Sequence, residues 1–122
     1  MFIVDKNGDI TLRQGDSGRL NIVGLPTDQN YTVFFAIQDE NRKPFGSEIS
    51  VNTNKSDKVV IVITAGLTDL LVVPKTENSK EYYYGIKLCT EAGDEDTSII
   101  GSSDITAYNT ITVLPKKVEG LL

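Results

Sequence analysis

The sequence predicts an all-β domain built as a two-sheet β-sandwich of about seven or eight antiparallel strands. Apolar and polar residues alternate with a period of two through most of the chain, as they do in strands with one buried face. The apolar runs are short, and Gly, Asn, Asp, Pro and Ser separate them. The chain has 122 residues, of which 39% are hydrophobic, and it contains no internal repeat. We therefore expect a single domain over residues 1–122, with 116–122 as a tail.

The first half of the chain contains the clearest alternation. The strand expected over residues 31–39 is partly apolar on both faces, which favours a central position in its sheet. Asn7-Gly8 is expected to supply the two positive-φ positions of a tight hairpin turn between the first two strands. The other strands expected here cover residues 2–4, 10–13, 19–22 and 47–53.

The second half opens with five consecutive β-branched residues, Val59–Ile63. Such a run disfavours a helix, and its apolar character on both sides predicts a strand that is buried on both faces at the centre of the core. One short helical turn is expected near 67–71, where leucines stand at helical spacing and Thr68 is placed to cap the turn. Further strands are expected over residues 82–89, 98–101 and 108–114.

The charge balance excludes two classes of partner. Seventeen acidic and twelve basic residues give a formal net charge of -5, which repels phosphate backbones and anionic membrane surfaces. Arg42-Lys43 and Lys116-Lys117 are the only adjacent basic pairs and neither extends into a basic patch, so we expect no nucleic-acid binding. No apolar stretch approaches the roughly 18 residues of a membrane span, and Asp5 interrupts the start of the chain too early for a signal peptide. We expect no membrane insertion and a location in the cytoplasm.

The residues needed for most kinds of catalysis are missing. The chain contains no histidine, so it cannot form a Ser-His-Asp or Cys-His arrangement or use an imidazole base. Cys89 is the only cysteine, which excludes an internal disulfide and a cysteine-based zinc cluster. Acidic residues fall mainly in predicted turns, where solvated charge is the ordinary state. The sequence predicts a protein with no enzymatic activity, no catalytic residues and no cofactor.

Asp5, Asn7 and Asp9 are weak candidates for metal ligands. They place oxygen atoms at alternate positions, as the opening of a calcium loop does. The glycine and the glutamate that such a loop needs further along are missing, and a hairpin turn explains the same residues. We prefer the turn, with calcium binding as the alternative.

Two other features are weak candidates for ligand binding. The acidic loop at residues 91–96 carries Asp94 and Asp96, which a calcium ion could use, although solvated charge in a surface hairpin is the simpler explanation. Tyr83 is expected to point outward while its two tyrosine neighbours point into the core, so it could stack on a sugar ring. One exposed tyrosine in a chain without tryptophan gives little support to a carbohydrate platform.

Four stretches between about residues 9 and 114 carry a resemblance to a known family: Asp9–Gly18 with its Gly-Asp turn, Val59–Thr64, the bridge Leu67–Leu71 and the aromatic hairpin strand Tyr82–Leu88. Their order resembles that of small immunoglobulin-like β-sandwich domains in tail and baseplate proteins of phages and prophages of Gram-positive bacteria. The chain is similar to the N-terminal domain of baseplate upper proteins.

The resemblance implies a structural role in a virion, or in the host cytoplasm during assembly. The partners would be other phage structural proteins or a second copy of the chain. Contact by strand addition is expected, because the edge strands of a sandwich carry backbone groups without partners. The alternative is a ligand-binding module for a carbohydrate or for calcium-dependent adhesion, which would use the loops at the ends of the sandwich.

Overall fold

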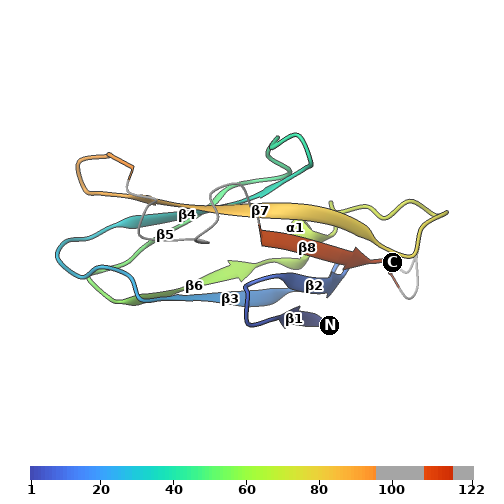
Figure 1. Ribbon diagram of the computed structural model, residues 1–122, viewed down its shortest axis with the longest axis horizontal. Coiled ribbons are helices and arrows are strands. Elements are labelled where there is room, and N and C mark those ends of the chain that lie inside the picture. The colour runs from blue at the N-terminus through green and yellow to red at the C-terminus, as the bar shows by residue number, and fades with distance from the viewer. Residues whose placement is uncertain (96–108, 117–122) are drawn as a thin grey trace.

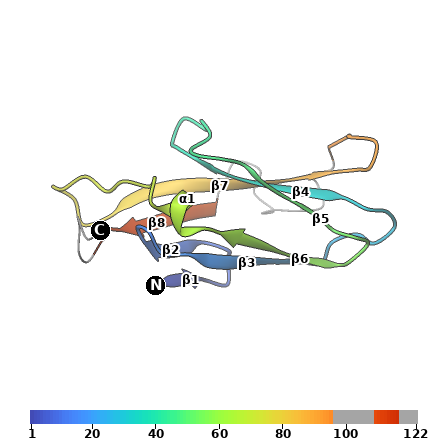
Figure 2. The same cartoon turned by 180° about the vertical axis from the view of Figure 1, so that it is seen from behind.

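The computed structural model describes residues 1–95 and 109–116. This part of the chain forms an all-β, sandwich-like fold of two sheets, as expected, with the two layers visible in Figures 1 and 2. The larger sheet contains, in spatial order, β1 (Phe2–Val4), β2 (Ile10–Arg13), β8 (Asn109–Leu114), β7 (Lys80–Cys89), β4 (Thr32–Gln38) and β5 (Ile49–Asn52). The smaller sheet contains β3 (Gly18–Val23) and β6 (Lys58–Ile63). The strand expected over 98–101 lies outside the described residues.

The core lies between the two sheets, and strict alternation builds it. In β4 the inward row is Val33, Phe35 and Ile37, and all three are almost completely buried. In β7 the inward row includes Tyr82 and Tyr84, at 5% and 4% exposure. β4 pairs with both β5 and β7, so its expected central position is confirmed.

The hydroxyl groups of both inward tyrosines donate hydrogen bonds to backbone carbonyls. The Tyr82 hydroxyl donates to the Val72 carbonyl at 2.8 Å, and the Tyr84 hydroxyl donates to the Gly8 carbonyl. The Tyr84 ring also packs on Phe35, with 5.1 Å between centroids. A buried hydroxyl needs such a partner, because burying it without a hydrogen bond is costly. These tyrosines therefore belong to the packing of the sandwich, as alternation predicts.

One pair of strands differs from the expectation of an antiparallel fold. β2 and β8 run parallel, with a register from Ile10↔Ile111 to Arg13↔Leu114. Hairpins force neighbouring strands to be antiparallel, but β2 and β8 lie at opposite ends of the described chain. The path of the chain between them sets their relative direction, and an alternation pattern does not record that path. The prediction of uniformly antiparallel strands is therefore wrong for this pair.

The prediction that residues 59–63 are buried on both faces is also wrong. Val59, Ile61 and Ile63 are buried in the core, whereas Val60 and Val62 are 42% and 50% exposed. β-branched residues favour a strand whichever face they occupy, so the run predicts the element correctly. The run predicts the burial of the strand incorrectly, because the described residues place no further layer over the outer face of β6.

The expected helical turn is present but begins two residues earlier. Helix α1 covers Ala65–Thr68, and its N-cap is Thr64, whose Oγ1 accepts a hydrogen bond from the Leu67 backbone N–H at 3.2 Å. Thr68 is not the cap. It is completely buried, and its hydroxyl donates to the Asp16 carbonyl at 2.9 Å. This bond connects α1 to the turn between β2 and β3.

Strand β1 contacts the smaller sheet through one close approach. A Cβ atom on Gly18 of β3 would lie 2.1–2.3 Å from ring carbons of Phe2, so only glycine leaves room for this ring. Phe2 thereby packs against the core beside β3. None of the helices in the described part of the chain is long and apolar enough to cross a membrane.

Candidate interaction surfaces

The acidic segment Asp5–Asp9 forms a hairpin turn. The Asp5 carboxylate Oδ1 accepts hydrogen bonds from the backbone N–H groups of Asn7 at 2.8 Å and Asp9 at 3.0 Å. Asp9 Oδ1 in turn accepts from the backbone N–H of Thr110 at 3.0 Å. Gly8 has a φ of 87°, but Asn7 does not have a positive φ, so the expected pair of positive-φ positions is wrong. The carboxylates of this segment hold backbone N–H groups in place.

The same turn occurs at residues 39–43 and, with a threonine at its first position, at residues 90–94. Asp39 Oδ1 accepts from the N–H groups of Asn41 at 2.8 Å and Lys43 at 3.0 Å, matching the bonds of Asp5. The fourth position has a positive φ in each turn, and Arg42 occupies it at 62° where the other two turns have glycine. Lys43 occupies the fifth position of this turn, where the first turn has Asp9. The turn therefore forms without a second acidic residue.

The second acidic loop is also a hairpin turn in its described part. The Asp94 backbone N–H donates to Thr90 Oγ1 at 3.2 Å, and Gly93 has a φ of 90°. The candidate ligand Asp96 lies outside the described residues. Within residues 1–95 and 109–116, no three His, Cys, Asp or Glu side chains are grouped so that they could hold a metal ion.

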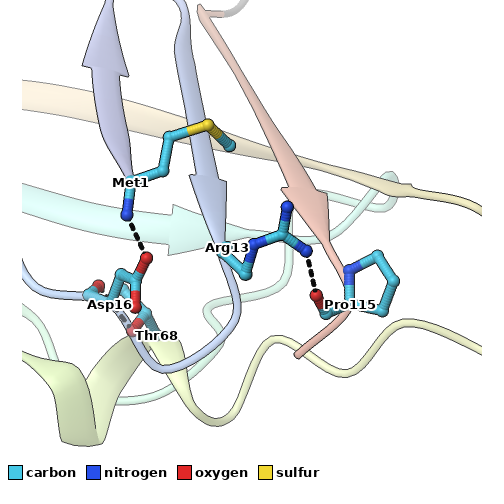
Figure 3. Close-up of polar contacts among 5 residues, drawn as sticks. All are labelled: Met1, Arg13, Asp16, Thr68 and Pro115. Atoms are coloured by element: carbon cyan, nitrogen blue, oxygen red, sulfur yellow. Dashed lines mark hydrogen bonds and ion pairs between the residues drawn. The ribbon is translucent and has the colours of Figure 1, made fainter. Parts of the chain in front are cut away.

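A polar hollow of about 630 Å³ lies at the end of the sandwich where the β2–β3 turn meets α1. The amino group of Met1 contacts the Asp16 carboxylate, and Arg13 Nη1 donates to the Pro115 carbonyl at 2.7 Å (Figure 3). Lys116 and Asp69 also line the hollow, and Lys116 Nζ lies 2.5 Å from a carboxylate oxygen of Asp69, which is half-exposed. Each of these charges has a partner within the chain. The hollow is a junction between structural elements, and surface pairs of this kind contribute little stability.

The pKa values of Tyr84, Tyr82 and Asp28 are shifted, and the causes are structural. Burial raises the pKa of Tyr84 to about 12, with a smaller contribution from the nearby carboxylates of Asp9 and Asp5. Burial also raises the pKa of Tyr82. The hydrogen bond from the Tyr31 hydroxyl, 2.7 Å long, lowers the pKa of Asp28. A raised tyrosine pKa keeps the hydroxyl neutral, which is the opposite of what a nucleophile or base requires.

The outer face of the smaller sheet carries an apolar stripe, and the sequence pattern assigns two of its residues, Val60 and Val62, to the core. We call Val23, Val60 and Val62 the valine stripe; they are 72%, 42% and 50% exposed. Val62 pairs with Arg19 at one end, and Val23 pairs with Lys58 at the other. A groove of about 570 Å³ runs beside Val23 and Val60. The stripe is therefore an exposed apolar surface with a cationic side chain at each end and with Asn21, the register partner of Val60, beside its middle.

The outer face of the larger sheet is hollowed over β4 and β7, at the position of the candidate Tyr83. Two adjoining hollows of about 240 and 230 Å³ share Gln38, and we call them together the outer hollow. Tyr83 lines one of them and is half-buried, so its predicted outward direction is confirmed. Ala36 and Gly85, which are register partners, line the other hollow. Alternation within β7 predicts that the Tyr83 side chain points outward. The hollow spans two strands and depends on their register, and the sequence pattern of one strand does not determine that register.

No protein-family model matches the chain, and no curated protein is significantly similar to it. Function must therefore be inferred from the chemistry of the valine stripe and the outer hollow.

Proposed function

We propose that this chain is a non-enzymatic interaction domain that acts through protein–protein contacts. The valine stripe is the observation that carries the proposal. β6 has the sequence of a strand buried on both faces, yet the described residues cover only one face. Apolar surface rimmed by polar and charged groups is typical of protein interfaces, and a partner would supply the missing layer.

Topology supports an immunoglobulin-like form of the sandwich. The pair β3–β6 corresponds to strands B and E, and the order β8-β7-β4-β5 corresponds to G, F, C and C′ of a variable-type domain. The bond from the Tyr82 hydroxyl, near the start of β7, to the Val72 carbonyl resembles the tyrosine corner of such domains. With Cys89 as its only cysteine, the chain lacks their inter-sheet disulfide.

The resemblance of the sequence to phage tail and baseplate domains supports a place in a virion or in its assembly. The partner would then be another phage structural protein or a second copy of the chain. Arg19 and Lys58 bring a positive charge to both ends of the stripe, in a chain with a net charge of -5. Electrostatic complementarity therefore favours a partner surface that is apolar at its centre and carries carboxylates at its rim.

The experiment compares Val60→Thr/Val62→Thr with Val72→Thr. Threonine keeps the branched shape and the β propensity, so the double variant should fold while its surface becomes polar. Val72 is 58% exposed and lies outside the stripe, which makes it a matched control. The proteins encoded by neighbouring genes are co-expressed with each variant, and self-association is measured by sedimentation velocity.

We expect the wild-type protein either to self-associate or to form a stable complex with one of these proteins. The double variant should weaken that contact by at least tenfold, since burying each valine contributes on the order of 1 kcal/mol. The control should bind as the wild type does. A wild-type protein that stays monomeric and binds none of these proteins would overturn the proposal, as would equal binding by the double variant.

A ligand-binding role is the second candidate, and the outer hollow is the observation that favours it. The loops at the ends of the sandwich are less suitable, because the turn carboxylates at Asp5 and Asp39 already accept backbone hydrogen bonds. The hollow lies on the opposite layer from the valine stripe, so the two candidates concern separate surfaces.

A further inference from the structure

Gly85 occupies a position where nothing in the described part of the fold requires glycine. It lies within the ten-residue strand β7, in an unbroken register with β4 and without a positive φ. Among the described residues, a Cβ atom built there would meet only the amide of Gln38, at an ordinary contact distance of 3.9 Å. Glycine in a strand interior weakens the strand and often marks a place where another molecule approaches closely. The packing of the described residues therefore does not account for a glycine at this position.

The floor of the outer hollow is small and apolar. Gly85 faces Ala36 across the β4–β7 ladder, so neither strand projects a long side chain at this point. Tyr83 and Gln38 form the next pair on one side, and Phe34 and Lys87 form the next pair on the other. The result is a shallow floor with an aromatic residue at each end.

The polar groups around this floor include hydrogen-bond donors, hydrogen-bond acceptors and charged side chains of both signs. The Gln38 amide offers both a donor and an acceptor beside Gly85, and Glu48 adds a carboxylate. Lys87 lies above the Phe34 ring, with Nζ 5.1 Å from its centroid, and 3.5 Å from Glu95. The whole outer hollow is lined by three carboxylates, from Asp39, Glu40 and Glu48, and by two cationic side chains, from Arg42 and Lys87. Because side chains of both signs line it, the site favours a neutral ligand with both hydroxyl donors and acceptors.

Backbone pairing excludes the main alternative mode of recognition. β4 is hydrogen-bonded to β5 and β7 on its two sides, so its N–H and C=O groups cannot accept an added peptide strand. A ligand at this face must be bound by side chains. Each half of the hollow is also smaller than the roughly 300 Å³ at which pockets for drug-sized ligands begin.

We propose that the outer hollow binds a neutral pyranose ring of a glycan. The C–H face of the ring packs over Ala36 and Gly85 and against Tyr83, and its hydroxyl groups exchange hydrogen bonds with Gln38 and Glu48. A ring of about twelve non-hydrogen atoms in a shallow site binds with a dissociation constant on the order of millimolar. This site is separate from the valine stripe and does not depend on the proposed protein contact.

The test is a titration of the ¹⁵N-labelled full chain followed by amide chemical shifts. The probes are methyl α-D-galactopyranoside, N-acetyl-D-glucosamine and L-rhamnose, with benzyl alcohol as an aromatic ligand that is not a sugar. Gly85→Val fills the hollow with a side chain that favours strands. Gly85→Ala is the milder second variant, and Thr112→Val, on the same outer face in β8, is the matched control.

We expect saturable shifts at Gln38, Tyr83 and Gly85 with at least one sugar. Gly85→Val should weaken this binding at least tenfold, Gly85→Ala should weaken it less, and Thr112→Val should leave it unchanged. The stripe variant Val60→Thr/Val62→Thr should bind the sugar as the wild type does. The proposal is overturned if no sugar gives saturable shifts at these residues, if Gly85→Val binds equally well, or if only benzyl alcohol binds.

Discussion

Substituting Gly18 by alanine should destabilise the protein through one identified contact, the Phe2 ring. The new Cβ atom would lie 2.1–2.3 Å from three carbons of that ring, far inside any tolerable separation, so the ring must leave its place. Phe2 is half-buried and packs against the core. Strand β1 would thereby lose its attachment to β3.

The size of the effect follows from what the ring loses. Complete removal of a core phenylalanine costs about 3–5 kcal/mol, so displacement of a half-buried one should cost about 2 kcal/mol. Replacing glycine by alanine within a strand raises the free energy of unfolding by about 0.5–1 kcal/mol. We therefore expect Gly18→Ala to lower the free energy of unfolding by roughly 1–1.5 kcal/mol. In a Phe2→Ala background, the same substitution should raise it by about 0.5 kcal/mol or more.

The assay is a double-mutant cycle measured by guanidinium unfolding, with far-ultraviolet circular dichroism because the chain contains no tryptophan. A coupling energy of about 2 kcal/mol between Gly18 and Phe2 is expected. Gly66→Ala is the control, since a Cβ atom there meets nothing within 4 Å and the helix should gain up to about 1 kcal/mol. Additive effects of Gly18→Ala and Phe2→Ala, within about 0.5 kcal/mol, would refute the contact.

Three further predictions concern the turns and the buried tyrosines. Arg42→Gly should raise the free energy of unfolding by about 0.5–1 kcal/mol, because its φ of 62° suits glycine better; a lower melting temperature would contradict this. Asp5→Ala and Asp39→Ala should each lower the free energy of unfolding, measured by thermal unfolding, by about 1 kcal/mol, because each carboxylate accepts two backbone N–H bonds in the same kind of turn. A loss of stability in only one of the two variants would show that the turns differ. Tyr84 has a pKa of about 12 in the folded state, above its ordinary 10.0, so the stability it contributes is fully present below pH 10 and is lost as pH rises toward 12. The loss should reach roughly 3 kcal/mol in urea unfolding at alkaline pH, and Tyr84→Phe should flatten this part of the curve.

The sequence predicts the elements well because local physics determines them. Alternation alone places Phe35 and Tyr84 in the core and Tyr83 on the outer face, since side chains in a strand point to opposite sides. The central position of β4 is also predicted locally, because apolar residues on both faces of a strand indicate that it lies inside a sheet. Strand boundaries and facing can thus be read from neighbouring residues without knowledge of the partner strands.

The candidate surfaces could not be predicted in the same way, because they depend on what lies beside each strand. An unbroken run such as Val59–Ile63 gives no alternation by which to separate a buried face from an exposed one. The outer hollow depends on the alignment of Ala36 with Gly85 across β4 and β7. The parallel direction of β2 and β8 depends in turn on the whole path of the chain.

The β2–β8 pair also constrains when the sheet can be completed during synthesis. A ribosome releases β2 before β3 to β7 and releases β8 after them, so one edge of β2 lacks its native partner while the intervening strands emerge. Until β8 inserts between β2 and β7, both of those strands present open edges to other chains. The larger sheet therefore cannot be completed until β8 has emerged, and a nascent chain stalled before residue 109 should be the species most prone to aggregate.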